Sequence, residues 1–227
     1  MRKIGIIAAM EPEMLMLKEA IDNIIEESIL GILFFKGKIG NNEVVLSLCG
    51  VGKVNASMAT TILINNYSCD LIINTGIAGG ISPLKPKDVV LANSLMYHDF
   101  DTTIFGYEYG QVPGMPKYFN ASKEALELVK AALNDLGISY TEGLVYSGDQ
   151  FVSSLEALKN VGNNALAVEM EGAAIAHVCV KAKVDFIVLR YISDIIGAKS
   201  QINDYLSFEK EMAQRSANIT LKLMHKI

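Results

Sequence analysis

The chain has 227 residues, of which 51% are hydrophobic and 20% charged, a composition that indicates a packed globular protein and excludes a disordered one. Its formal net charge of -5 and its few arginines leave no basic stripe that could follow a phosphate backbone, so nucleic acid is not an expected partner. The apolar run at residues 4–9 is too short for a signal peptide or a membrane span, and Cys49, Cys69 and Cys179 lack metal-ligand spacing. We therefore expect one cytoplasmic domain over residues 1–227, without a metal, a cofactor or a membrane partner.

Short apolar runs alternate with helical patterns along the chain. Glu11-Pro12-Glu13 is typical of a helix start, and Gly40-Asn41-Asn42 between two apolar runs predicts a β-hairpin. The predicted strands cover residues 3–9, 33–39, 44–49, 71–74, 89–95, 144–147, 165–169 and 186–192. The predicted helices cover residues 11–21, a segment after Gly52, residues 123–136, a segment through Ile175 and Val178, and a closing segment from Phe208 to Leu223.

This alternation predicts an α/β fold with a mixed, mainly parallel sheet flanked by helices, because several strands are apolar throughout and must be covered on both faces. Ligands of such sheets bind beyond the carboxyl ends of the strands. The loops expected there are residues 9–13, 76–80, 148–152, 169–171 and 193–194. Four of these five loops carry a carboxylate and the other is rich in glycine, so this edge of the sheet is the candidate site.

Each carboxylate also has a structural interpretation when it is taken alone. Glu13 lies in a first helical turn, where an acid favours the helix dipole, and Asp194 after a strand is able to cap a turn. Glu171 begins a helix too, but its neighbours are apolar, and a desolvated carboxylate needs a partner or a function. Asp149 follows Gly148 in a turn-forming pair and is interpreted as structural.

Two large side chains near these loops have alternative interpretations as well. Phe151 is either a core aromatic or a ring that stacks on a base beside the cleft. Arg190 lies inside an apolar strand, where an unpaired guanidinium is very costly. We therefore expect a buried pair between Arg190 and Glu169, and no catalytic role for the arginine.

Several carboxylates around an apolar pocket suit a reaction that develops positive charge on carbon, as glycosidic cleavage does. A proton donor is needed too, because a purine leaves well only after a ring nitrogen has been protonated. Other chemistries have no support in the sequence. His98, His177 and His225 lack metal-ligand spacing, and serine-nucleophile and phosphate-binding motifs are absent.

The motifs around these residues extend over almost the whole chain. They are residues 4–11, residues 50–56, Asn74-Thr75-Gly76 with Ala78-Gly79-Gly80, Tyr97-His98-Asp99, residues 105–111, Ser147-Gly148-Asp149, residues 168–174 and Ile192-Ser193-Asp194. In this order they resemble the 5'-methylthioadenosine/S-adenosylhomocysteine nucleosidase family of the purine nucleoside phosphorylase fold. The resemblance implies a partly barrel-like sheet and hydrolysis of the N-glycosidic bond of 5'-methylthioadenosine, S-adenosylhomocysteine or 5'-deoxyadenosine, with release of adenine.

The resemblance also implies a role for individual residues. Asp194 would be the general acid that protonates purine N7, held by Ser193, and Glu13 would activate the attacking water. Glu171 would bind the ribose hydroxyls together with Met170. The other implied substrate contacts are Phe151, which would stack on adenine, the Val152 backbone, which would read the base edge, and Ala78, Gly79 and Phe208.

The resembled family is homodimeric, and the aromatic-rich stretch at residues 104–119 fits a subunit interface. By this resemblance Phe105 and Pro113 of one subunit would close the 5' pocket of the other. The alternative is that this loop packs on its own chain.

Three positions depart from the family pattern. Ile77 stands where some members have serine, Tyr191 stands where alanine is usual, and residues 195–197 replace a more polar stretch. None of the three falls on Glu13, Met170, Glu171 or Asp194.

Two other functions remain open. A phosphorylase on the same fold would need fixed cationic donors for phosphate, yet Arg2, Arg190 and Arg215 all lie outside the five loops and Glu13 would repel the anion. A catalytically silent nucleoside-binding protein would not require Asp194 over the base together with a second carboxylate near the water.

Overall fold

A ten-stranded sheet organises the computed structural model, which describes residues 2–162 and 164–227. The strands are β1 (Lys3–Ala8), β2 (Asp22–Ile29), β3 (Ile32–Ile39), β4 (Asn42–Leu48), β5 (Leu71–Gly80), β6 (Val89–Tyr97), β7 (Phe119–Asn120), β8 (Thr141–Ser147), β9 (Ala167–Glu169) and β10 (Asp185–Ile195). The helices are α1 (Glu11–Glu19), α2 (Lys53–Asn65), α3 (Lys123–Asp135), α4 (Gly172–Ala182) and α5 (Gln201–Met224), with short 3-10 turns η1 (Thr103–Phe105) and η2 (Leu155–Leu158).

Part of the sheet closes on itself. The strand order is β10-β6-β8-β9-β5, and β5 pairs with β10 again, so these five strands form a closed ring. The order then continues from β5 through β1, β4, β3 and β2 as an open extension. This arrangement confirms the predicted mixed, mainly parallel and partly barrel-like sheet flanked by helices.

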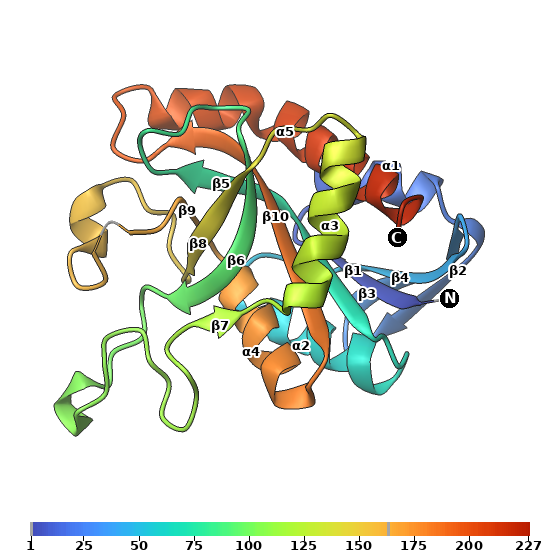
Figure 1. Cartoon of the computed structure of the whole chain (residues 1–227), viewed down its shortest axis with the longest axis horizontal. Helices are drawn as coiled ribbons and strands as arrows, with labels where there is room; N and C mark the ends of the chain where they lie inside the picture. The colour runs from blue at the N-terminus through green and yellow to red at the C-terminus, as the bar shows by residue number, and fades with distance from the viewer. Residues whose placement is uncertain (1, 163) are drawn as a thin grey trace.

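Helices cover the sheet in two groups. Helices α1 and α5 pack together and α5 lies along β5 and β10, whereas α2 and α4 pack together below the sheet (Figure 1). Apolar side chains of β1, β5 and β10, such as Ile6, Ile73 and Val188, are completely buried between these layers. None of the described helices combines the length and the apolar composition needed to cross a bilayer.

The edge of the sheet that carries the candidate site is not formed by parallel strands alone. Strands β1, β5 and β10 run parallel, so Ala8, Gly80 and Ile195 end on the same side. Strand β9 runs antiparallel to β5, but it pairs only through Gly79 and Gly80, where Gly79 faces Val168. The short β9 therefore brings Glu169 to the same edge from the opposite direction.

Some predicted strands differ from the observed ones. Strand β2 was not expected, because its side chains are mostly exposed and its state depends on antiparallel pairing with β3. Strand β5 was expected to end at Asn74 but continues to Gly80, because its glycine-rich half pairs with both β10 and β9.

Candidate active site

One pocket lies at the edge where β1, β5, β9 and β10 end. It encloses about 640 Å³ when its open mouth is included. Its acidic lining residues are Glu13, Glu169, Glu171 and Asp194, and no lysine, arginine or histidine of the described chain belongs to the lining. The remaining lining residues are Ala9, Met10, Val51, Ile77, Ala78, Gly79, Gln150, Phe151, Val152, Val168, Met170, Ser193, Ile196, Gln201 and Tyr205.

Glu13 is fixed by backbone groups from two elements. Its Oε2 accepts hydrogen bonds from the backbone N–H groups of Ala9, at 2.9 Å, and Met10, at 3.1 Å, which precede α1. Its Oε1 accepts from the N–H of Ile77 in β5 at 3.3 Å. A Cβ atom on Gly76 would lie 2.6 Å from this Oε1, so only glycine leaves room for the carboxylate there. Glu13 therefore both caps its helix and projects into the pocket.

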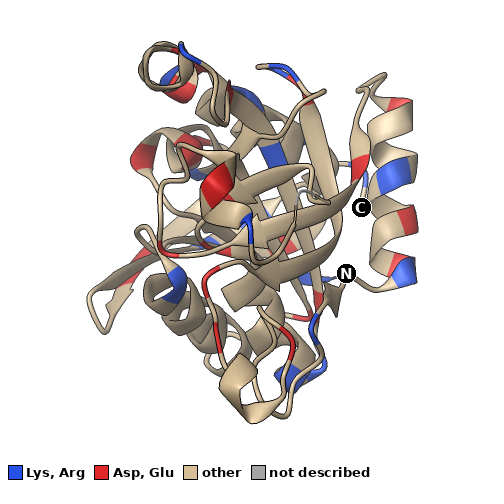
Figure 2. Ribbon diagram, turned by 90° about the vertical axis from the view of Figure 1, so that its left-hand side faces the viewer, with Lys and Arg blue, Asp and Glu red and all other residues tan. Residues whose placement is uncertain are grey.

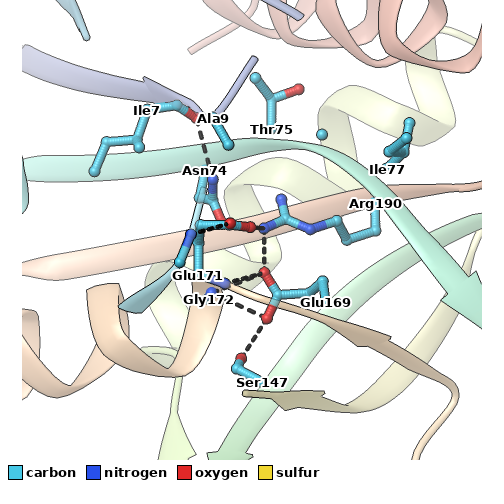
Figure 3. Close-up of polar contacts among 12 residues, drawn as sticks. Ile7, Ala9, Asn74, Thr75, Ile77, Ser147, Glu169, Glu171, Gly172 and Arg190 are labelled. Atoms are coloured by element: carbon cyan, nitrogen blue, oxygen red, sulfur yellow. Dashed lines mark hydrogen bonds and ion pairs between the residues drawn. The ribbon is translucent and has the colours of Figure 1, made fainter. Parts of the chain in front are cut away.

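Glu169 and Arg190 form the buried pair that the sequence predicts, and Figure 3 shows the polar side chains around it. The Arg190 guanidinium donates to a carboxylate oxygen of Glu169 and to Oδ1 of Asn74, and both charged side chains are 2% exposed. Glu169 also accepts from the N–H of Gly172 at 2.8 Å and from the Ser147 hydroxyl. Glu171 is the N-cap residue of α4, but its side chain makes no cap hydrogen bond, and Glu169 supplies the carboxylate at this helix start.

Glu171 points away from its own helix. Its Oε1 accepts at 2.9 Å from the N–H of Gly52, which precedes α2 and has a φ of 101°, a conformation that favours glycine. Its Oε2 lies 3.8 Å from Nη2 of Arg190. The single Arg190 cation thus faces two carboxylates directly, and a third, Glu13, nearby.

Burial sets the protonation of these acids. Desolvation raises the pKa of Glu13 above its usual range, although Arg190 opposes the shift. Burial, and then the adjacent Glu169, raise the pKa of Glu171 to about 8. Burial lowers the pKa of Arg190, but the facing carboxylates raise it by more, so the guanidinium stays charged. One fixed cation among several acids favours a protonated Glu171 at neutral pH.

Asp194 lies beside Gly79, further along β5 than Gly76, which faces Glu13, so the two acids mark two ends of the pocket. Asp194 is 1% exposed. Its Oδ1 accepts from the Ser193 hydroxyl at 2.5 Å, and its Oδ2 accepts from Nε2 of Gln201 at 2.9 Å. Burial raises the pKa of Asp194, while these two hydrogen bonds act in the opposite direction. A buried carboxyl group with a raised pKa is suited to donate a proton to a bound molecule.

Two aromatic rings line the same pocket as Asp194. Phe151 is 48% exposed and packs edge-on against Tyr205 of α5, with ring centroids 5.3 Å apart. The backbone of Val152, a buried residue, runs beside them and its carbonyl accepts from Gln201. A flat apolar ring beside backbone polar groups is the usual composition of a site for a planar heterocycle.

The structure brings most of the predicted residues into this one pocket. Those that line it are Glu13, Ala78, Gly79, Phe151, Val152, Met170, Glu171, Ser193 and Asp194. Phe208 lies outside the lining, with its ring 5.4 Å from the Lys87 ammonium. Asp149 lies outside as well, and its Oδ1 accepts from the N–H of Lys53 at 2.8 Å at the start of α2, in line with a structural role.

Phe105 and Pro113 also lie outside the pocket of this chain. Phe105 belongs to η1 and is 76% exposed, and the segment around it projects from the body in Figure 1, in green. The Phe105 ring is therefore not packed on its own chain, whereas Val112 and Met115 of the same stretch pack against the core. In the rest of the molecule, positively and negatively charged residues are interspersed, as Figure 2 shows for one side of it.

Sequence reasoning missed Gln201 and Tyr205. Both lie in the first two turns of α5, which begins earlier than predicted. Glutamine at a helix start is common, and an aromatic four residues later is typical of ordinary packing, so neither carried a signal.

Of the three departures from the family pattern, Ile77 lines the pocket and still supplies its backbone N–H to Glu13, and Ile196 also lines it.

An acid-lined pocket at the end of a closed, mixed sheet defines a class of nucleoside phosphorylase-like α/β proteins. The family model described as "Phosphorylase superfamily" matches residues 3–225. A 5'-methylthioadenosine/S-adenosylhomocysteine nucleosidase from Staphylococcus carnosus is 43% identical over 97% of this chain and 98% of its own length.

Solved structures agree in sequence and in fold. An S-adenosylhomocysteine nucleosidase from Streptococcus pyogenes, in complex with 5-methylthiotubericidin, superposes with a TM-score of 0.93 at 38% identity, over 100% of this chain and 97% of that one. Futalosine hydrolase of Helicobacter pylori gives a TM-score of 0.93 at 32% identity, over 100% and 98% of the two chains. The chain belongs to the phosphorylase superfamily and, within it, to the 5'-methylthioadenosine/S-adenosylhomocysteine nucleosidases, which are N-glycosyl hydrolases.

Proposed function

We propose that this enzyme hydrolyses the N-glycosidic bond of 5'-substituted adenine nucleosides, namely 5'-methylthioadenosine, S-adenosylhomocysteine and 5'-deoxyadenosine, and releases adenine. The observation that carries the proposal is the convergence of Glu13, Glu171 and Asp194 on one pocket that is lined by no cationic side chain of the described residues. Acids at both ends of an otherwise apolar cleft suit a transition state with positive charge on the sugar.

Asp194 is the general acid in this proposal. Its carboxyl group is buried, its pKa is raised by that burial, and it lines the same pocket as the ring of Phe151. Transfer of its proton to purine N7 neutralises the charge that adenine would otherwise carry as it leaves. Ser193 holds one carboxylate oxygen, which fixes the direction of the transfer.

Glu13 and Glu171 act at the sugar end. Glu13, held by backbone N–H groups, orients the water molecule and accepts a proton from it as the water attacks C1 of the ribose. Glu171 binds the ribose hydroxyls with Met170 beside it, and Ala78 and Gly79 line the same cavity. The balance is simple: the C–N bond breaks, a C–O bond to water forms, and adenine leaves with the proton from Asp194.

The position of Arg190 favours hydrolysis over phosphorolysis. The guanidinium of Arg190 is already bonded to Glu169, Asn74 and the Leu189 carbonyl, and the residue does not line the pocket. A phosphate placed there would meet carboxylates in place of a bidentate arginine. A silent binding protein would not need Asp194, which desolvation disfavours as an anion.

We propose in addition that the active enzyme is a homodimer. Phe105 and Pro113 are exposed in the single chain, and a second subunit would bury them over the 5' substituent. The identity of the 5' group is then set partly by the partner. An adenine nucleoside with a larger 5' group is a further candidate, because one structural relative is a futalosine hydrolase.

The test is adenine release from a panel of 5'-substituted adenosines, with and without phosphate. The proposal expects release from 5'-methylthioadenosine and S-adenosylhomocysteine at rates that phosphate does not change. Release that requires phosphate would assign the chain to the phosphorylases, and binding of these nucleosides without release would assign it to the silent binding proteins.

A further inference from the structure

The side chain of Gln201 fills the base end of the pocket. Gln201 is the first residue of α5 and is 4% exposed. Its Nε2 donates to the backbone carbonyl of Val152 and to Oδ2 of Asp194, each at 2.9 Å. One NH2 group therefore satisfies two acceptors that lie on different segments of the chain.

The orientation of this carboxamide is fixed by a third contact. The backbone N–H of Gly197 donates to Oε1 of Gln201 at 3.0 Å. Because an N–H can only donate, the oxygen of the carboxamide must face Gly197 and its NH2 must face the pocket. The two acceptors are thus a built site for an NH2 group, and Gln201 occupies it.

An adenine base would need the same two acceptors. On the proposed function, Asp194 faces N7 and the Val152 backbone faces the base edge, and the 6-amino group of adenine adjoins N7 on that edge. That amino group, like the glutamine NH2, carries two hydrogens, and both groups cannot occupy one position.

We propose that Gln201 is a specificity-determining residue that occupies the amino-group subsite of the empty enzyme and is displaced by the 6-amino group of the substrate. This inference rests on the proposed function. Displacement leaves the Val152 carbonyl and Asp194 Oδ2 without a donor, and a 6-amino purine restores both hydrogen bonds. A 6-oxo purine places a carbonyl oxygen against the Val152 carbonyl and Asp194 Oδ2. None of the three atoms donates, so this base cannot replace the glutamine.

The surroundings allow the displacement. Gly197 and residues 199–200, which precede α5, are exposed, and the neighbouring Ile202 is 62% exposed. Rotation of the Gln201 side chain towards solvent therefore breaks its three hydrogen bonds without removing a large apolar group from the core. Only molecules in which the Gln201 side chain has left the subsite can bind the base there. The apparent affinity for the base is therefore proportional to the fraction of such molecules.

Calorimetric titration of adenine and steady-state kinetics on Gln201→Ala and Gln201→Met test the inference. Neither new side chain donates a hydrogen bond to Val152 or Asp194, so both variants should bind adenine about tenfold more tightly and show a correspondingly lower KM. Hypoxanthine should remain a weak ligand throughout. Asn203→Ala, an exposed change in the same helical turn, is the matched control and should change nothing.

The outcomes separate this inference from the proposed function. Unchanged or weaker adenine binding in both Gln201 variants, with an active wild type, would overturn the inference alone, and a large loss of kcat would make Gln201 a positioning residue for Asp194. A wild-type enzyme that neither binds adenine nor releases it would instead remove the proposed function.

Discussion

The two ends of the pocket are built in different ways. At the sugar end, Glu13 and Glu171 are held by backbone N–H groups of the β1–α1 turn, β5 and Gly52, beside the buried Arg190. At the base end, Asp194 is held by the side chains of Ser193 and Gln201. Backbone N–H groups keep their positions unless the chain itself moves, whereas a hydroxyl and a carboxamide can rotate. On the proposed function, this difference gives a preorganised end for water and ribose and an adjustable end for the base.

The largest effect is expected at the base end. Asp194→Asn removes the proton donor but keeps the shape and the hydrogen-bonding capacity of the side chain, so turnover should fall about 100-fold or more. Adenine affinity, measured by titration, should stay within a few-fold of the wild type. Asp204→Asn, in α5 but outside the pocket lining, is the control. Full activity in Asp194→Asn would remove this residue from the mechanism.

The sugar end should respond almost as strongly. Glu13→Gln keeps a hydrogen-bond acceptor but cannot take a proton from water, so kcat should fall about 100-fold with little change in KM. Glu11→Gln, an exposed change in the same helical turn, should leave both constants unchanged. A loss confined to KM would show that Glu13 binds substrate and does not activate water.

A substitution in the exposed stretch at residues 104–119, which lies outside the pocket of its own chain, is expected to have a smaller effect. Phe105→Ala removes an aromatic ring from the proposed partner contribution, so the KM for 5'-methylthioadenosine should rise about tenfold, the scale of a buried phenyl group. Adenine affinity should not change, because adenine lacks the 5' group. Sedimentation of the wild type should show a dimer, and a monomer with full activity would contradict the partner's role.

The smallest effect concerns stability and pH. The folded protein keeps the Glu171 proton up to about pH 8, whereas the ordinary pKa is 4.5. Between these values the folded state binds more protons than the unfolded state, so this group makes stability fall as pH rises. Glu171→Gln has no such proton, and its stability relative to wild type should therefore increase across that window. Urea unfolding at several pH values measures this, with Glu156→Gln on the surface as the control; parallel curves would contradict a raised pKa.

Sequence patterns predicted the sugar end better than the base end. Carboxylates after apolar strands, and an arginine inside one, are costly in a core, so the Arg190–Glu169 pair could be predicted and Glu171 stood out. Glu13 also fitted a helix-dipole role, and the roles of both acids came from the family resemblance. Gln201 is neutral and stands at a helix start, and its contacts depend on how α5 packs over the loop that contains Val152. Strand β2 was missed for a similar reason, since pairing with β3, not its own pattern, makes it a strand.

The central claim is that water, directed by acids at the sugar end, replaces a base that is protonated at the other end. The most direct measurement is mass spectrometry of the sugar formed from 5'-methylthioadenosine in 18O-labelled water with phosphate present. The account predicts free 5-methylthioribose with one 18O atom at C1. A sugar 1-phosphate without the label would contradict it.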